Sequence, residues 1–154
     1  MIVLSDDPYL SRFARSLGYG GLLPLAILIG LSLLQPPWAG TAARIGIVYG
    51  GAILAFLGGI QWGFALRSTV PAVRVRRLAA GVLPSLWVTG TLLLPVDLCV
   101  PLLVAGLVAL LVYEFLEQRE AHELPPWYLP LRLQLTAGLS VELGLLYAVA
   151  VVGA

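Results

Sequence analysis

Glu142 carries the strongest chemical signal in the sequence, because it is the one charged residue in the stretch 133–154. A charged side chain at the centre of a bilayer costs roughly 2.5–3.5 kcal/mol on insertion scales, so Glu142 should face other helices and be paired or protonated. Gln134 and Gly138 precede it at four-residue intervals, which puts all three on one helix face. A ligand or proton site and a structural hydrogen bond between helices are both open interpretations.

A second group of polar and aromatic residues lies beside two apolar stretches. Gln61 and Trp62 come near the end of one stretch, and Trp127, Tyr128 and Arg132 precede another. Together they could line a pocket for a lipid, a quinone or a porphyrin-like ring, with the arginine binding a carboxylate or phosphate. However, tryptophan and tyrosine also concentrate at membrane interfaces, where a neighbouring arginine is an ordinary anchor. Both interpretations remain open.

Other chemistry-bearing patterns are absent from the sequence. There is no glycine-rich phosphate loop, nucleophile elbow or zinc-ligand spacing. Cys99 is the only cysteine, which excludes an internal disulfide and a thiolate cluster. The net charge of +1 gives no electrostatic reason to expect nucleic acid as a partner. We therefore expect a non-enzymatic protein without a metal or dedicated cofactor, although a bound lipid or quinone remains compatible with the residues above.

The composition indicates that lipid surrounds most of the chain. Apolar residues make up 60% of the 154 residues and charged residues 11%, and the mean hydropathy is +0.97. Soluble domains have about 45–50% apolar and about 25% charged residues. A soluble protein of this size has too little interior to hide so much apolar surface. The partner of this chain is therefore expected to be the lipid bilayer.

Five stretches between charged residues predict an all-α membrane bundle of five helices in one domain, residues 17–154. Each is close to the roughly 20 residues that a spanning helix needs. They are residues 17–34, 45–66, 78–96, 98–113 and 133–154. A re-entrant hairpin competes for the third and fourth stretches, but unpaired backbone groups at bilayer depth favour complete helices. Residues 1–16 should form a cytoplasmic segment, compatible with an interfacial helix, and residues 114–123 a charged helical extension.

The arginines predict the orientation of this bundle. Five crossings would put eight arginines on one side, Arg12, Arg15, Arg67, Arg74, Arg76, Arg77, Arg119 and Arg132, and Arg44 alone on the other. Short loops rich in arginine stay in the cytoplasm. We expect a cytoplasmic N-terminus and a periplasmic C-terminus. Since the first residues do not resemble a secretory or transit peptide, the expected location is the bacterial cytoplasmic (inner) membrane.

Small residues at four-residue intervals predict a helix-packing face within residues 45–66. They are Gly51, Ala55, Gly59 and Gly63. Small side chains let another helix backbone approach closely, which drives helix association in lipid. This face could join two copies of the chain, bind another membrane subunit, or pack within the bundle itself.

Several motifs in order resemble a family of small membrane proteins that includes mitochondrial transmembrane protein 69 and bacterial relatives. The matching segments are LGYGGLLP at 17–24, YGGAILAFLGGIQWG at 49–63, LPS at 83–85, WYLPLR at 127–132 and LT at 135–136. The resemblance runs from about residue 17 to the C-terminus. It implies a five-helix membrane domain of unknown function, whose pattern includes the glycine face and the aromatic–arginine segment. Glu142 is not part of that pattern, and Ala55 stands where relatives often have serine.

Two functional hypotheses follow. The first is an accessory or assembly subunit of a larger membrane complex, because the chain is small and has almost no extramembrane part. The second is a carrier or sensor that binds an apolar ligand near Gln61, Trp127, Arg132 and Glu142. A ligand retained through purification would distinguish the second hypothesis from the first.

Overall fold

The computed structural model describes residues 8–121 and 124–152, and the described residues form helices and no strands. This confirms the predicted all-α class. The elements are α1 (Pro8–Gly20), α2 (Leu23–Leu34), the short 3-10 helix η1 (Pro36–Trp38), α3 (Ala39–Arg67), α4 (Pro71–Leu92), α5 (Val96–Ala121) and α6 (Tyr128–Val152). Residues 1–7 of the predicted N-terminal segment lie outside the described residues.

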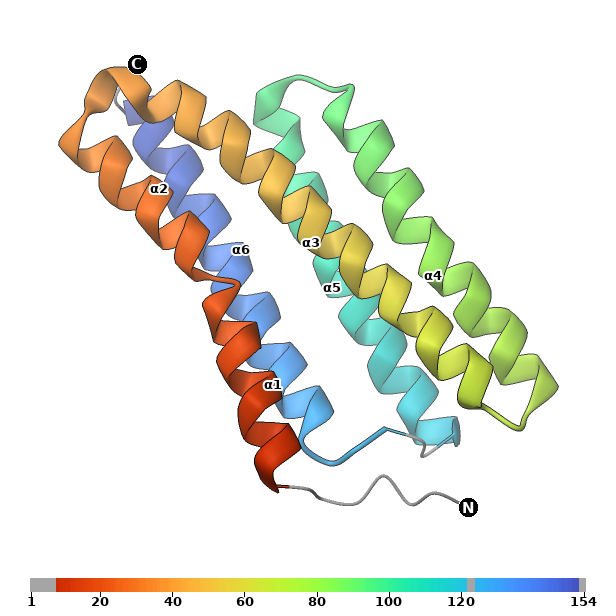
Figure 1. The fold of residues 1–154 in the computed structure, drawn as a ribbon. Coiled ribbons are helices and arrows are strands. Elements are labelled where there is room, and N and C mark those ends of the chain that lie inside the picture. The colour runs from red at the N-terminus through yellow and green to blue at the C-terminus, as the bar shows by residue number, and fades with distance from the viewer. Residues whose placement is uncertain (1–7, 122–123, 153–154) are drawn as a thin grey trace.

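The helices run back and forth along one bundle axis (Figure 1). Helices α1 and α2 run in the same direction, α3 returns, and α4, α5 and α6 alternate after it, so α6 ends at the opposite end from the start of α1. Gly21 and Leu22 separate α1 from α2, where Pro24 lies in the first turn of α2. The Tyr49 hydroxyl of α3 donates a 2.7 Å hydrogen bond to the carbonyl of Gly21, which fixes this break against the bundle.

Four helical segments are long and apolar enough to cross a membrane. They are Pro8–Leu34, Pro36–Arg67, Val96–Arg119 and Tyr128–Val152. The third predicted stretch is helical as well, but α4 is not among these four segments. Its first two turns contain three arginines, and the apolar run after Arg77 ends with the helix at Leu92, which is short of the roughly 20 residues that span a bilayer.

The helix ends differ from the predicted boundaries at one end of the bundle. Helix α5 continues through the predicted charged extension to Ala121, and Glu114, the first residue of this extension, is only 1% exposed. Glu114 therefore lies inside the bundle, although the sequence placed it at the charged edge of an apolar stretch. Helix α6 begins at Tyr128, so Tyr128 and Arg132 lie within the helix rather than before it. Charged residues delimit a stretch only where they face solvent, and a buried, paired charge does not end a helix.

Helix α3 is the centre of the bundle and packs against α2, α4, α5 and α6. The core consists mainly of leucines, including Leu25, Leu54, Leu103, Leu107, Leu143 and Leu146. The contact between α3 and α4 is especially close at two glycines. A methyl group on Gly58 would lie 3.0 Å from the Gly81 carbonyl oxygen and 2.8 Å from Cγ of Pro84, so this α3–α4 seam has no room for a side chain.

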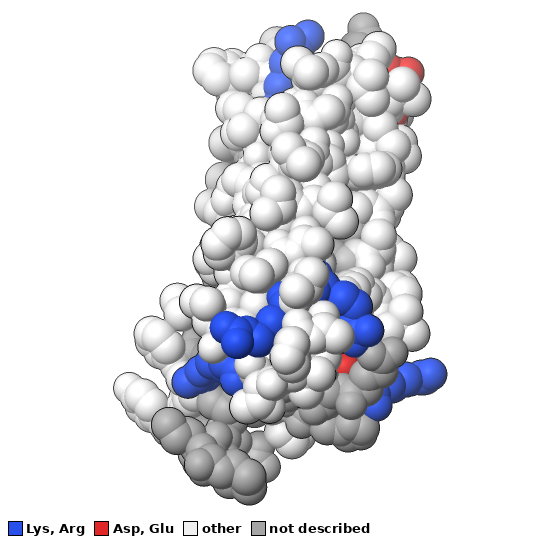
Figure 2. Space-filling model, turned by 90° about the vertical axis from the view of Figure 1, so that its right-hand side faces the viewer, with Lys and Arg blue, Asp and Glu red and all other residues white. Residues whose placement is uncertain are grey.

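Charged side chains gather at the two ends of the bundle. Figure 2 shows a broad band without charged residues on one face, a large group of arginines below it and a smaller charged group above. We call the end with the large group of arginines the arginine end. It includes Arg67 at the end of α3 and Arg74, Arg76 and Arg77 at the start of α4. An uncharged band between two charged ends is the surface that a membrane protein presents to lipid.

Candidate functional site: a buried charged cluster and an apolar groove

A buried carboxylate joins three helices at the arginine end. Glu114 of α5 accepts hydrogen bonds at Oε1 from Gln61 Nε2 of α3 (2.7 Å) and from the Tyr128 hydroxyl of α6 (2.9 Å). Its Oε2 accepts one from Nε of Arg132, also at 2.9 Å. None of the four side chains is more than 8% exposed. We call these four residues the Glu114 cluster.

Aromatic contacts connect the Glu114 cluster to α4. The rings of Phe64 and Tyr128 meet edge to face with centroids 5.4 Å apart. The guanidinium carbon of Arg77 lies 5.6 Å from the Phe64 ring centroid, and Arg77 is only 1% exposed. A cation over an aromatic face is attracted by the ring quadrupole, and more strongly where water is excluded. Helices α3, α4, α5 and α6 therefore all contribute to this end of the core.

The geometry of the Glu114 cluster is that of a structural network in which both carboxylate oxygens are paired. Arg132 balances the charge of Glu114, and both carboxylate oxygens accept hydrogen bonds. Such a buried pair stabilises a fold only while both partners are present, because either charge left alone is costly. Within the described residues, Nη2 of Arg132 is the one atom of the cluster that is buried without a hydrogen-bond partner.

The sequence had suggested that Gln61, Tyr128 and Arg132 would converge, and the structure brings these three together. The carboxylate that Arg132 binds is Glu114 of the same chain rather than that of a ligand. Trp62 is 48% exposed, and its indole lies against Gly81 of α4. Trp127 meets Tyr128 edge to face at 6.3 Å. Trp127 thus packs on one member of the Glu114 cluster, and within the described part of the chain neither tryptophan is hydrogen-bonded to it.

Gln134 and Glu142 lie away from this cluster. The exposed Gln134 accepts a 2.5 Å hydrogen bond from the Tyr19 hydroxyl of α1. Glu142 lies ten residues beyond Arg132, or about 15 Å along α6. It is partly buried, and its Oε2 has no hydrogen-bond partner within the described residues. Between them lies Gly138, which would meet Leu22 if it carried a methyl group. The stripe of α6 formed by Gln134, Gly138 and Glu142, which we call the Gln134 stripe, therefore faces the α1–α2 segment.

Sequence reasoning missed Glu114 and Arg77 as interior residues. Both were treated as the charged edges of apolar stretches. One signal could have found Glu114: it falls on the same helix face as Leu103, Leu107 and Leu110, at helical spacing. All three leucines are at most 5% exposed. A lone acid that continues a core-facing stripe is a candidate for a buried pair.

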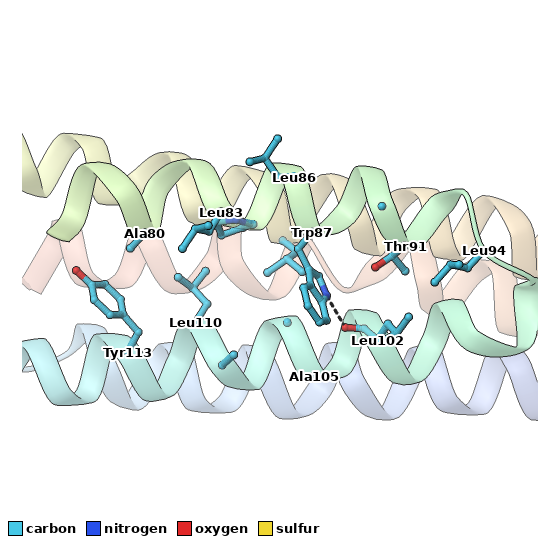
Figure 3. Close-up of a pocket in the computed structure, with 15 residues that line it drawn as sticks. Ala80, Leu83, Leu86, Trp87, Thr91, Leu94, Leu102, Ala105, Leu110 and Tyr113 are labelled. Carbon is cyan, nitrogen blue, oxygen red and sulfur yellow. Dashed lines mark hydrogen bonds between the residues drawn. The ribbon is translucent and has the colours of Figure 1, made fainter. Parts of the chain in front are cut away.

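A large hollow lies between α4 and α5 and is almost entirely apolar (Figure 3). Its volume is about 860 Å³. Leu54 of α3 lines it together with residues of α4 and α5, from Thr91 and Leu94 at one end to Ala80 and Tyr113 at the other. The indole nitrogen of Trp87 donates a 2.8 Å hydrogen bond to the Leu102 carbonyl across this α4–α5 groove. None of the seven predicted ligand residues lines it.

The predicted packing face divides between the inside and the outside of the bundle. Gly51 faces α4, where a methyl group would lie 2.8 Å from Cγ1 of Val88, and Ala55 is partly buried. Gly59 and Gly63 are exposed and have open space beside them. They line a second, shallower hollow with Ile60, Phe64 and Arg67. The other close contact of α3 with α4 is at Gly58, one residue out of the predicted register.

A comparison with protein-family models finds a match along most of the helical chain. A family model described as a protein of unknown function, DUF3429, matches residues 10–148. The chain belongs to the DUF3429 family. The match extends from α1 into α6, so the DUF3429 region includes both the Glu114 cluster and the α4–α5 groove. The narrower resemblance to transmembrane protein 69 stays a prediction, and no curated protein or solved structure matches the chain.

Proposed function

We propose that this protein crosses its membrane five times and binds a lipid-like molecule in the α4–α5 groove. The observation that carries the proposal is the groove itself, an apolar space of about 860 Å³ between two helices of a bundle that is otherwise filled with leucine. Binding sites for small molecules are mostly apolar hollows of about 300–1,000 Å³. This is the carrier or sensor hypothesis, moved to the groove from the region of Gln61, Trp127, Arg132 and Glu142.

The proposal requires α4 to be the fifth crossing. Helix α4 runs antiparallel to α3 and α5 and lies beside both. If these neighbours span the bilayer, α4 has to span it with them, and its three arginines would then lie at the headgroups. The excess of arginine at that end favours a cytoplasmic arginine end, and hence a cytoplasmic N-terminus and periplasmic C-terminus. A periplasmic reporter fused to the C-terminus should be active; activity only of a cytoplasmic reporter would overturn this orientation.

Filling the groove tests the binding proposal. Gly90 lines the groove, and a methyl group there would meet nothing within 4 Å, so Gly90→Leu should fold while occupying the space. Gly30→Leu is the matched control, because Gly30 lies in α2 outside the groove and also has open space. In a variant that retains Trp87 as its only tryptophan, lipids with brominated acyl chains should quench the fluorescence.

The expected result is that Gly90→Leu lowers this quenching while Gly30→Leu leaves it unchanged. Equal quenching in both variants would mean that acyl chains reach Trp87 without using the groove, and the proposal would fail. The protein can be assayed whole in detergent micelles, and its helical content by circular dichroism establishes that both variants are folded.

A role as an accessory subunit is a second candidate, favoured by the exposed part of the glycine face. Gly59 and Gly63 leave a hollow on the outside of α3 into which a helix of another subunit could pack. Crosslinking from Gly63→Cys in native membranes should then trap a partner or a second copy. A chain that remains monomeric in membranes, with no crosslinked product, would count against this role.

A further inference from the structure

An ion pair closes one end of the α4–α5 groove. On α4, Arg76 precedes the lining residues Ala80 and Leu83 at helical spacing, so it continues their face by one turn. On α5, Glu117 follows the lining residue Tyr113 in the same way. Nη2 of Arg76 lies 3.1 Å from Oε1 of Glu117, which bridges the two helices at the point where the apolar lining ends.

The two partners of this ion pair differ in exposure. The Arg76 side chain is 46% exposed, whereas that of Glu117 is 6% exposed. Arg76 can therefore bind a group from outside while it remains beside the groove. Arg74 is also exposed on the same helix, and α4 contains no acidic residue. The groove thus ends at a positively charged surface of α4.

The length of the groove suits one hydrocarbon chain. From Ala80 to the end of α4 at Leu92 the helix rises about 18 Å at 1.5 Å per residue. One leaflet of a bilayer has about 15 Å of hydrocarbon, half of the roughly 30 Å core. A lipid with its headgroup at the arginine end would therefore place one acyl chain along the groove, past Trp87 and toward Thr91.

We infer that the occupant of the groove is an anionic glycerophospholipid, whose phosphate binds Arg76 and one of whose acyl chains lies between α4 and α5. This inference rests on the proposed function and adds the chemical class of the ligand. The phosphate competes with Glu117 for the guanidinium, and Arg74 adds attraction for a lipid with net negative charge. A zwitterionic lipid with the same chains fills the groove equally well but loses this attraction.

Two lipids with identical chains test the headgroup. Native mass spectrometry of the purified protein should be titrated with dioleoyl phosphatidylglycerol and, separately, with dioleoyl phosphatidylcholine. We expect tighter binding of phosphatidylglycerol by about fivefold, the factor that one arginine near the surface contributes for an anionic lipid. Arg76→Gln should remove this preference. Arg44→Gln, at the opposite end of the bundle, is the control and should keep it.

A second variant separates headgroup recognition from loss of folding. Glu117→Gln removes the competing carboxylate but retains Arg76, so it should increase the preference for phosphatidylglycerol. Equal binding of the two lipids, with both reduced by Gly90→Leu, would overturn the inference and leave the proposed function standing. Binding of both lipids that is unaffected by Gly90→Leu would overturn the proposed function and this inference together.

Discussion

The Glu114 cluster and the α4–α5 groove are opposite kinds of space between helices, because polar side chains fill the first and the second is an apolar hollow. In the cluster, both oxygens of Glu114 are occupied by side chains of the same chain, and its members are almost fully buried. In the groove, a large apolar space is crossed by the hydrogen bond from Trp87 to the Leu102 carbonyl. The difference teaches that polar, inward-facing residues do not mark the unfilled space in this bundle. The polar residues bind one another, and the unfilled space is apolar.

Removing the carboxylate of Glu114 should have the largest effect. Glu114→Ala leaves Arg132 buried and unpaired, and losing one partner of a buried ion pair costs about 3–5 kcal/mol of unfolding free energy. Denaturant unfolding in detergent measures the loss. Glu142→Ala is the control, because the structure gives Oε2 of Glu142 no partner within the described residues. Equal losses of unfolding free energy in the two variants would contradict the view that Glu114 stabilises the fold through its buried ion pair.

The α3–α4 seam should tolerate a side chain far less than the outer face of α3. In Gly58→Ala the new methyl group would meet Pro84 and the Gly81 carbonyl, and such overpacking typically costs about 1–3 kcal/mol. Gly59→Ala places the same group one residue later in open space and should stabilise α3 slightly, since alanine favours helices. Thermal unfolding of both variants checks this, and similar midpoints would contradict the close seam.

Trp87→Phe should affect the groove more gently. The variant removes the hydrogen bond to the Leu102 carbonyl, and a typical hydrogen bond contributes about 0.5–1.5 kcal/mol. We expect a stability loss in that range, together with easier separation of α4 and α5. Distances between spin labels on the two helices would measure the separation; an unchanged distribution would show that this hydrogen bond does not limit the width of the groove.

The smallest effect is expected for Tyr19→Phe. This variant removes the hydrogen bond to Gln134, but Gln134 is exposed and can find another partner. We expect a loss below about 0.5 kcal/mol, at the lower limit for a hydrogen bond. A loss as large as that of Glu114→Ala would mean that the Gln134 stripe of α6, rather than the Glu114 cluster, is the critical polar contact. Denaturant unfolding under the same conditions permits the direct comparison.

The helices could be predicted from the sequence because their signals are local. Long uncharged stretches identify α3, α5 and α6, and the Gln35-Pro36-Pro37 break ends α2 where expected. The convergence of Gln61, Tyr128 and Arg132 was also foreseen, since Gln61 lies near the end of one apolar stretch and the other two lie just before the start of another. Their partner was missed, because a charge at the edge of a stretch looks the same in sequence whether it faces water or the core.

The groove could not be predicted in this way. Ala80, Gly90, Ala105 and Gly106 are small residues that form a hollow only because α4 and α5 face one another with small side chains on both sides. The register between two helices depends on the whole bundle, so the sequence of either helix alone does not indicate it. The glycine face shows the same limitation: Gly51 and Gly58 make close contacts with α4, whereas Gly59 and Gly63, which share the four-residue pattern of Gly51, have open space beside them.

The position of the groove on the side of the bundle determines how a molecule would reach it. Leu83 and Trp87 line the groove but are 61% and 45% exposed, so its long side opens toward hydrocarbon. Exchange would then take place sideways within a leaflet, without passing through water. Detergent tails would compete for the same space during extraction, so what the protein retains after purification should change with the detergent's chain length.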